Sequence, residues 1–362
     1  MKTVFVLAIA ATSVVFSIGC RPAIQSDSQP QTFETPNTEI KNQGRIGFCW
    51  AYAAIAMIES DYKRRTGKDI DLSEESLGFF LLAEYIKQGG DQFLRTALSL
   101  PTTQPKIEEG SSIPEAFSLI ARWGLIPESQ WSVKFDTDSE VNQAKDSIAG
   151  EWRQKVEALR INGSNAVPFD DVVSILTKKA FRTPPPFQSF DNGSGAMSAI
   201  RYAREVIGFN PNNYEFVTID GAAGSSAFSS NIQRIKEVLS RGGVVGIELS
   251  MPASDPSSAS RIQGKRFIGM GMPFKIDGAH AMVITDFKNS NGNFGKSLNP
   301  MEEVAKPLEP GMQFQLKNSW GSQSGFNEFG AQVQTGYYEM DVMYLLDILQ
   351  SGGIFRLTFP RI

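Results

Sequence analysis

A glycine-containing loop leads directly into an apolar helical pattern near the start of the chain, and a cysteine stands at the junction. Gly44 and Gly47 indicate an irregular loop, and apolar residues then recur at helical spacing over residues 51–62. We therefore expect Cys49 at a helix N-terminus, where unpaired backbone N–H groups and the helix dipole lower the pKa of a thiol. A cysteine in this place can also be a buried core residue, so its chemistry depends on partners elsewhere.

Scarce residue types limit those partners. The 362 residues include two cysteines and one histidine, which excludes a disulfide framework and Cys/His-rich metal sites. The 35 basic and 39 acidic residues include no long basic run, so no nucleic-acid partner is expected. Hydrophobic residues make up 41% of the chain, which is enough for a buried core and argues against disorder. A chain of this length forms one large domain or two ordinary ones.

The single histidine lies at the start of a buried strand pattern. His280 follows a turn signal and leads into the small apolar run 281–284. A second strand pattern ends in the cluster Asn318-Ser319-Trp320-Gly321. An isolated histidine in such a setting is either a satisfied core residue or a general base, and its being the sole histidine favours the second interpretation.

These blocks together resemble the papain-like cysteine peptidases. The resemblance rests on Gln43-Gly44-x-x-Gly47-x-Cys49-Trp50, on Gly278-x-His280-Ala281, and on Asn318-Ser319-Trp320-Gly321, in the order of that family. It covers most of residues 39–345, discontinuously. It implies an α+β fold with two lobes: a helical lobe carrying Cys49 and a β-barrel-like lobe carrying His280 and Asn318, with the cleft between them.

The resemblance also implies a role for each site residue. Cys49 would attack the scissile carbonyl as a low-pKa thiolate paired with the imidazolium of His280, which would then protonate the leaving amine. Asn318 would orient the ring, and Trp320 would shield the bond between them from water. The Gln43 amide and the Cys49 N–H would stabilise the oxyanion. The implied activity is peptide-bond hydrolysis of a peptide or protein substrate through a thioester acyl-enzyme, with no cofactor and no metal.

Substrate contacts are implied less directly. Ser73, followed by acidic residues, starts one predicted helix, and the segment 109–113 begins another that runs to residue 123. Gly110 and Ser111 resemble the family's substrate rim, where bare backbone pairs with a bound peptide like an added strand. Trp320 is grouped with them as a substrate-binding residue. Two alternatives concern the same region: Gly89-Gly90 as the rim, and Phe48, which replaces a small residue and could narrow the site.

The spacing of the blocks predicts an insertion. His280 follows Cys49 by 231 residues, whereas about 130–150 is usual for the downstream residues of this family. We place the insertion at about residues 135–215, helical around 147–159, with a second at 289–311. The family pattern resumes with a helix near 232–239 and a strand near 244–249. One hypothesis is that the first insertion restricts the cleft.

The N-terminus carries a targeting pattern. Residues 1–19 read as a signal peptide, with Lys2 before an apolar stretch too short to span a membrane. Cys20 follows, in a pattern that resembles a bacterial lipoprotein signal. An ordinary cleaved signal is the alternative. Residues 20–38 are then a flexible, lipid-anchored tether, and 39–362 the peptidase domain. We expect an exported monomer held on the periplasmic or cell-surface face of a bacterial membrane through a lipid on Cys20.

Two other function classes stay open. One is a catalytically inactive peptidase-like lipoprotein that binds peptides without turnover. The other is a cell-wall amidase or acyltransferase that uses the same Cys–His chemistry. Labelling by a thiol-reactive epoxide separates the first from a peptidase, and a comparison of peptide with peptidoglycan substrates separates the second.

Overall fold

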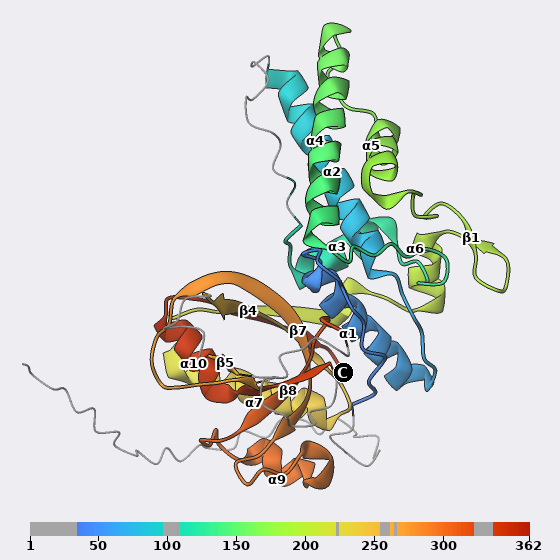
Figure 1. Cartoon of the computed structure of the whole chain (residues 1–362). Coiled ribbons are helices and arrows are strands. Elements are labelled where there is room, and N and C mark those ends of the chain that lie inside the picture. The colour runs from blue at the N-terminus through green and yellow to red at the C-terminus, as the bar shows by residue number, and fades with distance from the viewer. Residues whose placement is uncertain are drawn as a thin grey trace, which may run out of the picture. The chain divides into compact units, whose positions relative to one another are not determined.

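The described elements fall into a helical part and a β-rich part that meet at the first helix (Figure 1). The computed structural model describes residues 35–96, 107, 109–221, 224–253, 261–263, 266–321 and 336–362. All belong to one of two units, Gln31–Ile362. The other unit, Met1–Pro30, contains the predicted signal and Cys20, which lie outside the described residues. No helix in the described ranges combines the length and apolar character that crossing a membrane requires.

Helix α1 (Cys49–Thr66) begins at the predicted cysteine. It ends at Gly67, whose φ of 70° lies in the left-handed region and whose N–H donates to the Lys63 carbonyl at 2.8 Å. Every residue from 50 to 60 is buried, because α2 (Glu74–Thr96), α3 (Ile113–Trp123) and two strands of the sheet pack around this helix. The helix that carries Cys49 is therefore the joint between the two parts.

The two other predicted helix starts are confirmed. The Ser73 hydroxyl accepts the N–H three residues on at 3.3 Å and caps α2. Ser112 caps α3 in the same way, also at 3.3 Å. Gly89 and Gly90 lie inside α2, so the alternative that they form a substrate rim is wrong.

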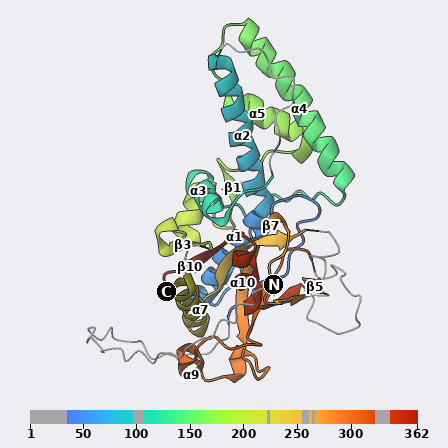
Figure 2. The ribbon, with the colours of Figure 1, turned by 90° about the vertical axis from the view of Figure 1, so that its left-hand side faces the viewer.

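The inserted segment adds mostly helical structure to the helical part. Its elements are α4 (Asp138–Ile161), α5 (Phe169–Leu176), η1 (Thr177–Phe181), β1 (Phe190–Asp191), β2 (Ala196–Met197), α6 (Ala199–Arg201), η2 (Tyr202–Val206) and η3 (Pro211–Asn213). Helices α4 and α5 pack on α2, and α6 packs on α3 (Figures 1 and 2). The expected helix at 147–159 is confirmed within α4. That the insertion narrows the cleft stays a prediction.

The β-rich part is one eight-stranded sheet with the order β3-β10-β4-β7-β8-β9-β6-β5. The strands are β3 (Tyr214–Ile219), β4 (Val245–Pro252), β5 (Ile262–Gln263), β6 (Arg266–Phe267), β7 (Ile276–Lys288), β8 (Gln313–Lys317), β9 (Tyr337–Asp341) and β10 (Phe355–Pro360). Only the β6–β9 pair among these is parallel. Helices α7 (Gly224–Ser240), α9 (Pro300–Ala305) and α10 (Val342–Gln350) and the turn η4 (Gly295–Ser297) complete it. The expected helix and strand after the insertion correspond to α7 and β4.

Each part has its own hydrophobic core. One core gathers buried side chains mostly from the helical part, together with Tyr214, Ala281 and Val283 from the sheet and Val244 just before β4. The other lies among the sheet strands, α7 and α10. The fold is α+β with a helical lobe and a β-rich lobe, as predicted, and α1 packs against β7 and β4 where the lobes meet.

Residues 35–42, here called the N-terminal strap, connect both lobes. The Thr35 hydroxyl donates to the Thr285 carbonyl of β7 at 2.6 Å, and the Thr38 hydroxyl donates to the Glu59 carboxylate of α1 at 3.0 Å. Thr35 is buried. The predicted tether at 20–38 therefore extends too far, because its last residues are fixed by hydrogen bonds to the folded domain.

Candidate active site

Cys49 is the first residue of α1 and is half-buried. The backbone N–H groups of Ala281 and Trp50 interact with its sulfur. Ala281 follows His280 on β7, so the fold brings the thiol against the strand that carries the histidine. Within the described residues no hydrogen bond joins the sulfur to the imidazole. Cys49 and His280 are thus neighbours where the two lobes meet, but their side chains are not hydrogen-bonded to each other.

Asn318 fixes the ring of His280. The Nε2 atom of His280 lies 2.8 Å from the Asn318 Oδ1, and this oxygen also accepts the backbone N–H of Ser319 at 2.8 Å. Because Oδ1 is an acceptor, Nε2 carries the proton of a neutral imidazole, and Nδ1 keeps its lone pair. Both side chains are buried. The predicted pairing of His280 and Asn318 is therefore present, and it leaves Nδ1 as the basic atom.

Trp320 covers this pair. Its ring stacks on the imidazole of His280 at 4.6 Å between centroids and 30° between planes, and the edge of Tyr338 supports it at 5.6 Å. An aromatic face over a buried hydrogen bond keeps water away and strengthens the bond. The structure thus places Trp320 where shielding was expected, and its direct contact with substrate stays a prediction.

Gln43 is held by the same turn that carries Asn318. The Ser319 hydroxyl donates to the Gln43 Oε1, and the Gln43 backbone N–H donates to the Ser319 carbonyl at 2.8 Å. The Gln43 Nε2 donates one hydrogen to the Ile46 carbonyl at 2.9 Å. Within the part of the chain that the structure describes, we find no partner for its second amide hydrogen, and its role toward an oxyanion stays a prediction. Ser319 belongs to the Asn-Ser-Trp-Gly cluster, but its role could not be predicted, because its partner Gln43 is 276 residues away.

Comparisons with known proteins show which proteins this chain resembles. A family model described as papain family cysteine protease matches residues 28–78. Ananain of Ananas comosus is 37% identical over 82 residues, which cover 20% of this chain and 24% of ananain. The senescence-specific cysteine protease SAG12 of Arabidopsis thaliana is 26% identical over 234 residues, which cover 61% of this chain and 59% of that protein. The chain thus spans less than two thirds of the length of the curated relatives it matches.

A solved structure, PepW of Lactobacillus rhamnosis, has the same fold, with a TM-score of 0.57 at 15% identity over 93% of this chain and 82% of that one. Segments of this chain are thus similar to papain family cysteine proteases, and its fold is that of PepW. The four predicted residues Gln43, Cys49, His280 and Asn318 converge at the joint between α1 and β7, from positions dispersed along the chain.

The predicted substrate rim lies beside α1. Gly110 is exposed, with nothing within 4 Å of the place a Cβ would take, and Ser111 is half-buried. The Trp50 Nε1 donates to the carbonyl of the preceding residue, Glu109, at 2.8 Å. At Gly110 the predicted rim is thus bare backbone, tied through Glu109 to the helix that carries Cys49, and its pairing with a peptide stays a prediction.

Phe48 does not narrow the site. Its side chain is completely buried, and a Cβ added at Gly78 of α2 would lie 2.1 Å from its ring. The ring also packs edge-to-face against Trp50, with centroids 6.2 Å apart. The expectation that Phe48 restricts the cleft is wrong, because the absence of a side chain at Gly78 opens a place for the ring inside the helical lobe.

Glu248, a buried carboxylate near the Cys49 thiol, was not predicted from the sequence. It lies on β4 opposite Ala281, and its Oε1 accepts the Ile113 N–H at the start of α3, at 3.1 Å. Burial raises the pKa of this carboxyl. No local pattern distinguishes Glu248 from a surface residue of a strand, so the sequence held no signal for it.

The environments of Cys49 and His280 favour their neutral forms. Burial raises the pKa of the Cys49 thiol and the charge of Glu248 adds to this, while the N–H groups of Ala281 and Trp50 oppose it. Burial lowers the pKa of His280 to about 4, against the effect of its bond to Asn318. In the substrate-free site burial thus acts against the low thiol pKa and the resting thiolate–imidazolium pair that the resemblance implies. The ion pair stays a prediction.

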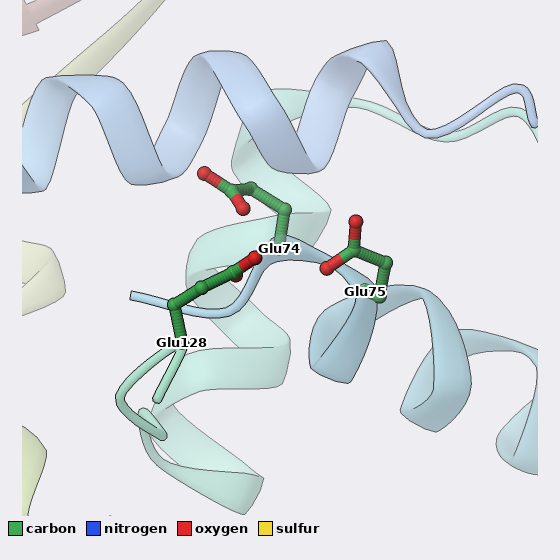
Figure 3. A group of neighbouring side chains, drawn as sticks. All are labelled: Glu74, Glu75 and Glu128. Carbon is green, nitrogen blue, oxygen red and sulfur yellow. The ribbon is translucent and has the colours of Figure 1, made fainter. Parts of the chain in front are cut away.

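Three carboxylates, Glu74, Glu75 and Glu128, form a cluster in which one oxygen of each lies within 4.8 Å of the others (Figure 3). Lys41 Nζ lies 2.8 Å from Glu74, and the Tyr52 hydroxyl donates to Glu75. Burial raises the pKa of both Glu74 and Glu75. An ammonium group and a hydroxyl thus stabilise this cluster, and we assign no metal to it.

Proposed function

We propose that this chain is a papain-like cysteine peptidase, which hydrolyses peptide bonds of peptide or protein substrates through Cys49. As the sulfur attacks the scissile carbonyl carbon, the thiol proton moves to Nδ1 of His280, so that the thiolate–imidazolium pair forms during the reaction. The tetrahedral intermediate then expels the amine, which takes the proton, and a thioester remains on Cys49. Water that loses a proton to the same imidazole hydrolyses the thioester and restores the thiol.

The oxyanion of the intermediate needs donors that are already in place. The second Nε2 hydrogen of Gln43 and the backbone N–H of Cys49 serve this role in the proposal. The Ser319 hydroxyl on Oε1 supports it, because this contact directs the amide nitrogen of Gln43 away from Ser319.

One observation carries the proposal. His280 has its Nε2 proton held by Asn318 at 2.8 Å, on the strand whose next residue touches the Cys49 sulfur. A histidine that only filled the core would not need an amide oxygen to hold its Nε2 proton on the strand that contacts the thiol. This arrangement suits a base that takes a proton from Cys49.

The test compares the full chain with Cys49→Ala and His280→Ala on a mixed peptide library, with thermal unfolding to verify each fold. We expect cleavage and epoxide labelling at Cys49 in the natural chain, and loss of cleavage in both variants. Cleavage that persists in Cys49→Ala would rule out the nucleophile. Labelling without turnover indicates a peptide-binding protein, and turnover of peptidoglycan alone indicates an amidase or acyltransferase.

We further propose that the protein is exported and anchored through a lipid on Cys20. The apolar segment before Cys20 and the polar stretch after it support this. When a bacterial host expresses the natural chain in the presence of labelled fatty acid, we expect the label on the chain and the chain in the membrane fraction. Cys20→Ala, with its peptidase residues unchanged, should lose both. Membrane retention of that variant would contradict the lipid anchor.

A further inference from the structure

Glu109 connects the inserted helix α4 to the loop that carries the nucleophile. One carboxylate oxygen accepts the N–H of Gly47, two residues before Cys49. The other forms an ion pair with Lys145 of α4. The carbonyl of Glu109 accepts the Nε1–H of Trp50, the residue after Cys49, at 2.8 Å. A single residue therefore holds the chain on both sides of the nucleophile.

The loop and the insertion also fit closely. A Cβ at Gly47 would lie 3.0 Å from the Glu109 carboxylate, so the close approach of this loop depends on glycine. The Arg45 N–H donates to the Phe135 carbonyl at 2.9 Å, and a Cβ at Gly44 (φ +64°) would lie 2.1 Å from that oxygen. Phe135 lies two residues before Thr137, which begins the capping box of α4. The start of the insertion is thus a second support for the nucleophile loop.

The ion pair between Glu109 and Lys145 bears on the position of the loop because the Glu109 side chain is largely buried. The side chain of Glu109 is 10% exposed and that of Lys145 is 35% exposed. A carboxylate this far from water needs a cation or donors, and removing the cation leaves an unfavourable charge beside the loop. Without Lys145, the Glu109 carboxylate is free to turn toward solvent, which weakens its hydrogen bond with the Gly47 N–H. The position of the loop therefore depends on a residue of the insertion.

We propose that Lys145 and Glu109 are positioning residues, which brace the 47–49 loop from the insertion and keep the Cys49 N–H and sulfur in place for acyl transfer. The consequence for catalysis rests on the proposed function, whereas the position of the thiol does not. The insertion then acts as a support for the nucleophile.

The test uses Lys145→Met, Lys145→Arg and a matched control, Lys155→Met. Lys155 lies on the same helix and pairs with Asp171 of α5 at 2.8 Å, with side chains 39% and 28% exposed. In the full chain we expect Lys145→Met to lower kcat about tenfold with KM little changed, since small misplacements of reacting groups slow chemistry strongly. Lys145→Arg restores the cation and should recover most of kcat. Lys155→Met should match the natural chain.

A second readout works without peptidase activity. Site-resolved mass spectrometry of Cys49 alkylation reports the surroundings of the thiol, and we expect its rate to change at least about threefold in Lys145→Met alone. Equal kcat and equal alkylation rates in the two methionine variants would overturn the brace, as would failure of arginine to restore them. If the natural chain cleaves nothing, the proposed function fails, and the alkylation comparison still decides on the brace.

Discussion

At the scale of single residues, the orientation of one amide is set by a distant hydroxyl. Ser319 donates to the Oε1 of Gln43, so the opposite, donating end of this side chain is directed away from the turn. An amide that is free to flip would present oxygen to the oxyanion half of the time and would repel it. Ser319 therefore acts through Gln43.

Ser319→Ala should lower kcat roughly three- to tenfold, about the value of one lost hydrogen bond, with KM little changed. Alkylation of Cys49 should keep its rate, because no oxyanion forms in that reaction. Ser230→Ala is the control. It removes an exposed hydroxyl that donates to the Ala227 carbonyl of the same helix, α7. An unchanged kcat in Ser319→Ala would show that Gln43 needs no such support.

The raised pKa of Cys49 has a direct kinetic signature. Because burial favours the neutral thiol, alkylation of Cys49 in the substrate-free chain should be slow at acid pH and still rise above about pH 8.5, the ordinary thiol range. Iodoacetamide labelling followed by peptide mass spectrometry measures this without interference from Cys20. A fast rate that stays flat from acid to neutral pH would show a resting ion pair.

The lowered pKa of His280 links folding to acidity. The unfolded chain takes up a proton below about pH 6.5, whereas the folded chain does so only near pH 4. Stability from this group is therefore complete above pH 6.5 and falls as the pH drops to 4, by roughly 3 kcal/mol. Urea unfolding from pH 7 to 4 should show a steeper loss than in His280→Gln. Parallel curves would contradict a buried, neutral imidazole.

At the scale of elements, the contact between α1 and α2 depends on a missing side chain. Phe48 occupies the space over Gly78, where a Cβ would lie 2.1 Å from the ring. Gly89, on the same helix, has nothing within 4 Å of the Cβ position. The same substitution at the two glycines therefore separates packing from helix propensity.

Gly78→Ala should destabilise the protein by about 1–3 kcal/mol through overpacking, although alanine favours a helix. Gly89→Ala should stabilise it by up to about 1 kcal/mol. Chemical unfolding measures both. Stabilisation by both substitutions would mean that Phe48 moves aside without cost.

Local chemistry made the elements around the site predictable. The starts of α1, α2 and α3 follow from a glycine loop and two serine caps, each readable within a few residues. The direction of Phe48 was not predictable, because it depends on Gly78, 30 residues away and on another helix. The contact of Glu109 with Gly47 joins residues 62 apart and left no local pattern either.

At the scale of the whole molecule, the strap at residues 35–42 ties the lobes through buried polar groups. Lys317, next to Asn318, donates to the Thr38 hydroxyl at 2.6 Å, and burial lowers its pKa to about 8. Glu59 of α1 accepts from the same hydroxyl. The family resemblance placed the catalytic residues in two lobes. Residues 35–38 of the strap were predicted to be part of the tether, because their sequence does not show which groups they contact.

Thr38→Val should cost about 1–3 kcal/mol, since it leaves a buried ammonium and a buried carboxylate each short of a partner. Thr66→Val, at an exposed helix end whose hydroxyl donates to the Tyr62 carbonyl and accepts the Lys68 N–H, should change stability by about 0.5 kcal/mol or less, because water replaces both bonds. Thermal unfolding compares the two. Equal effects would mean that the strap contributes no specific stability.

The route of the strap decides where a mechanical load would enter this molecule. A pull on the chain upstream of Thr35 reaches the bond to Thr285 on β7 first, then the contact of Thr38 with α1, and so the seam where Cys49 and His280 meet. Traction at that end would therefore load α1 and β7, the two elements that carry Cys49 and His280.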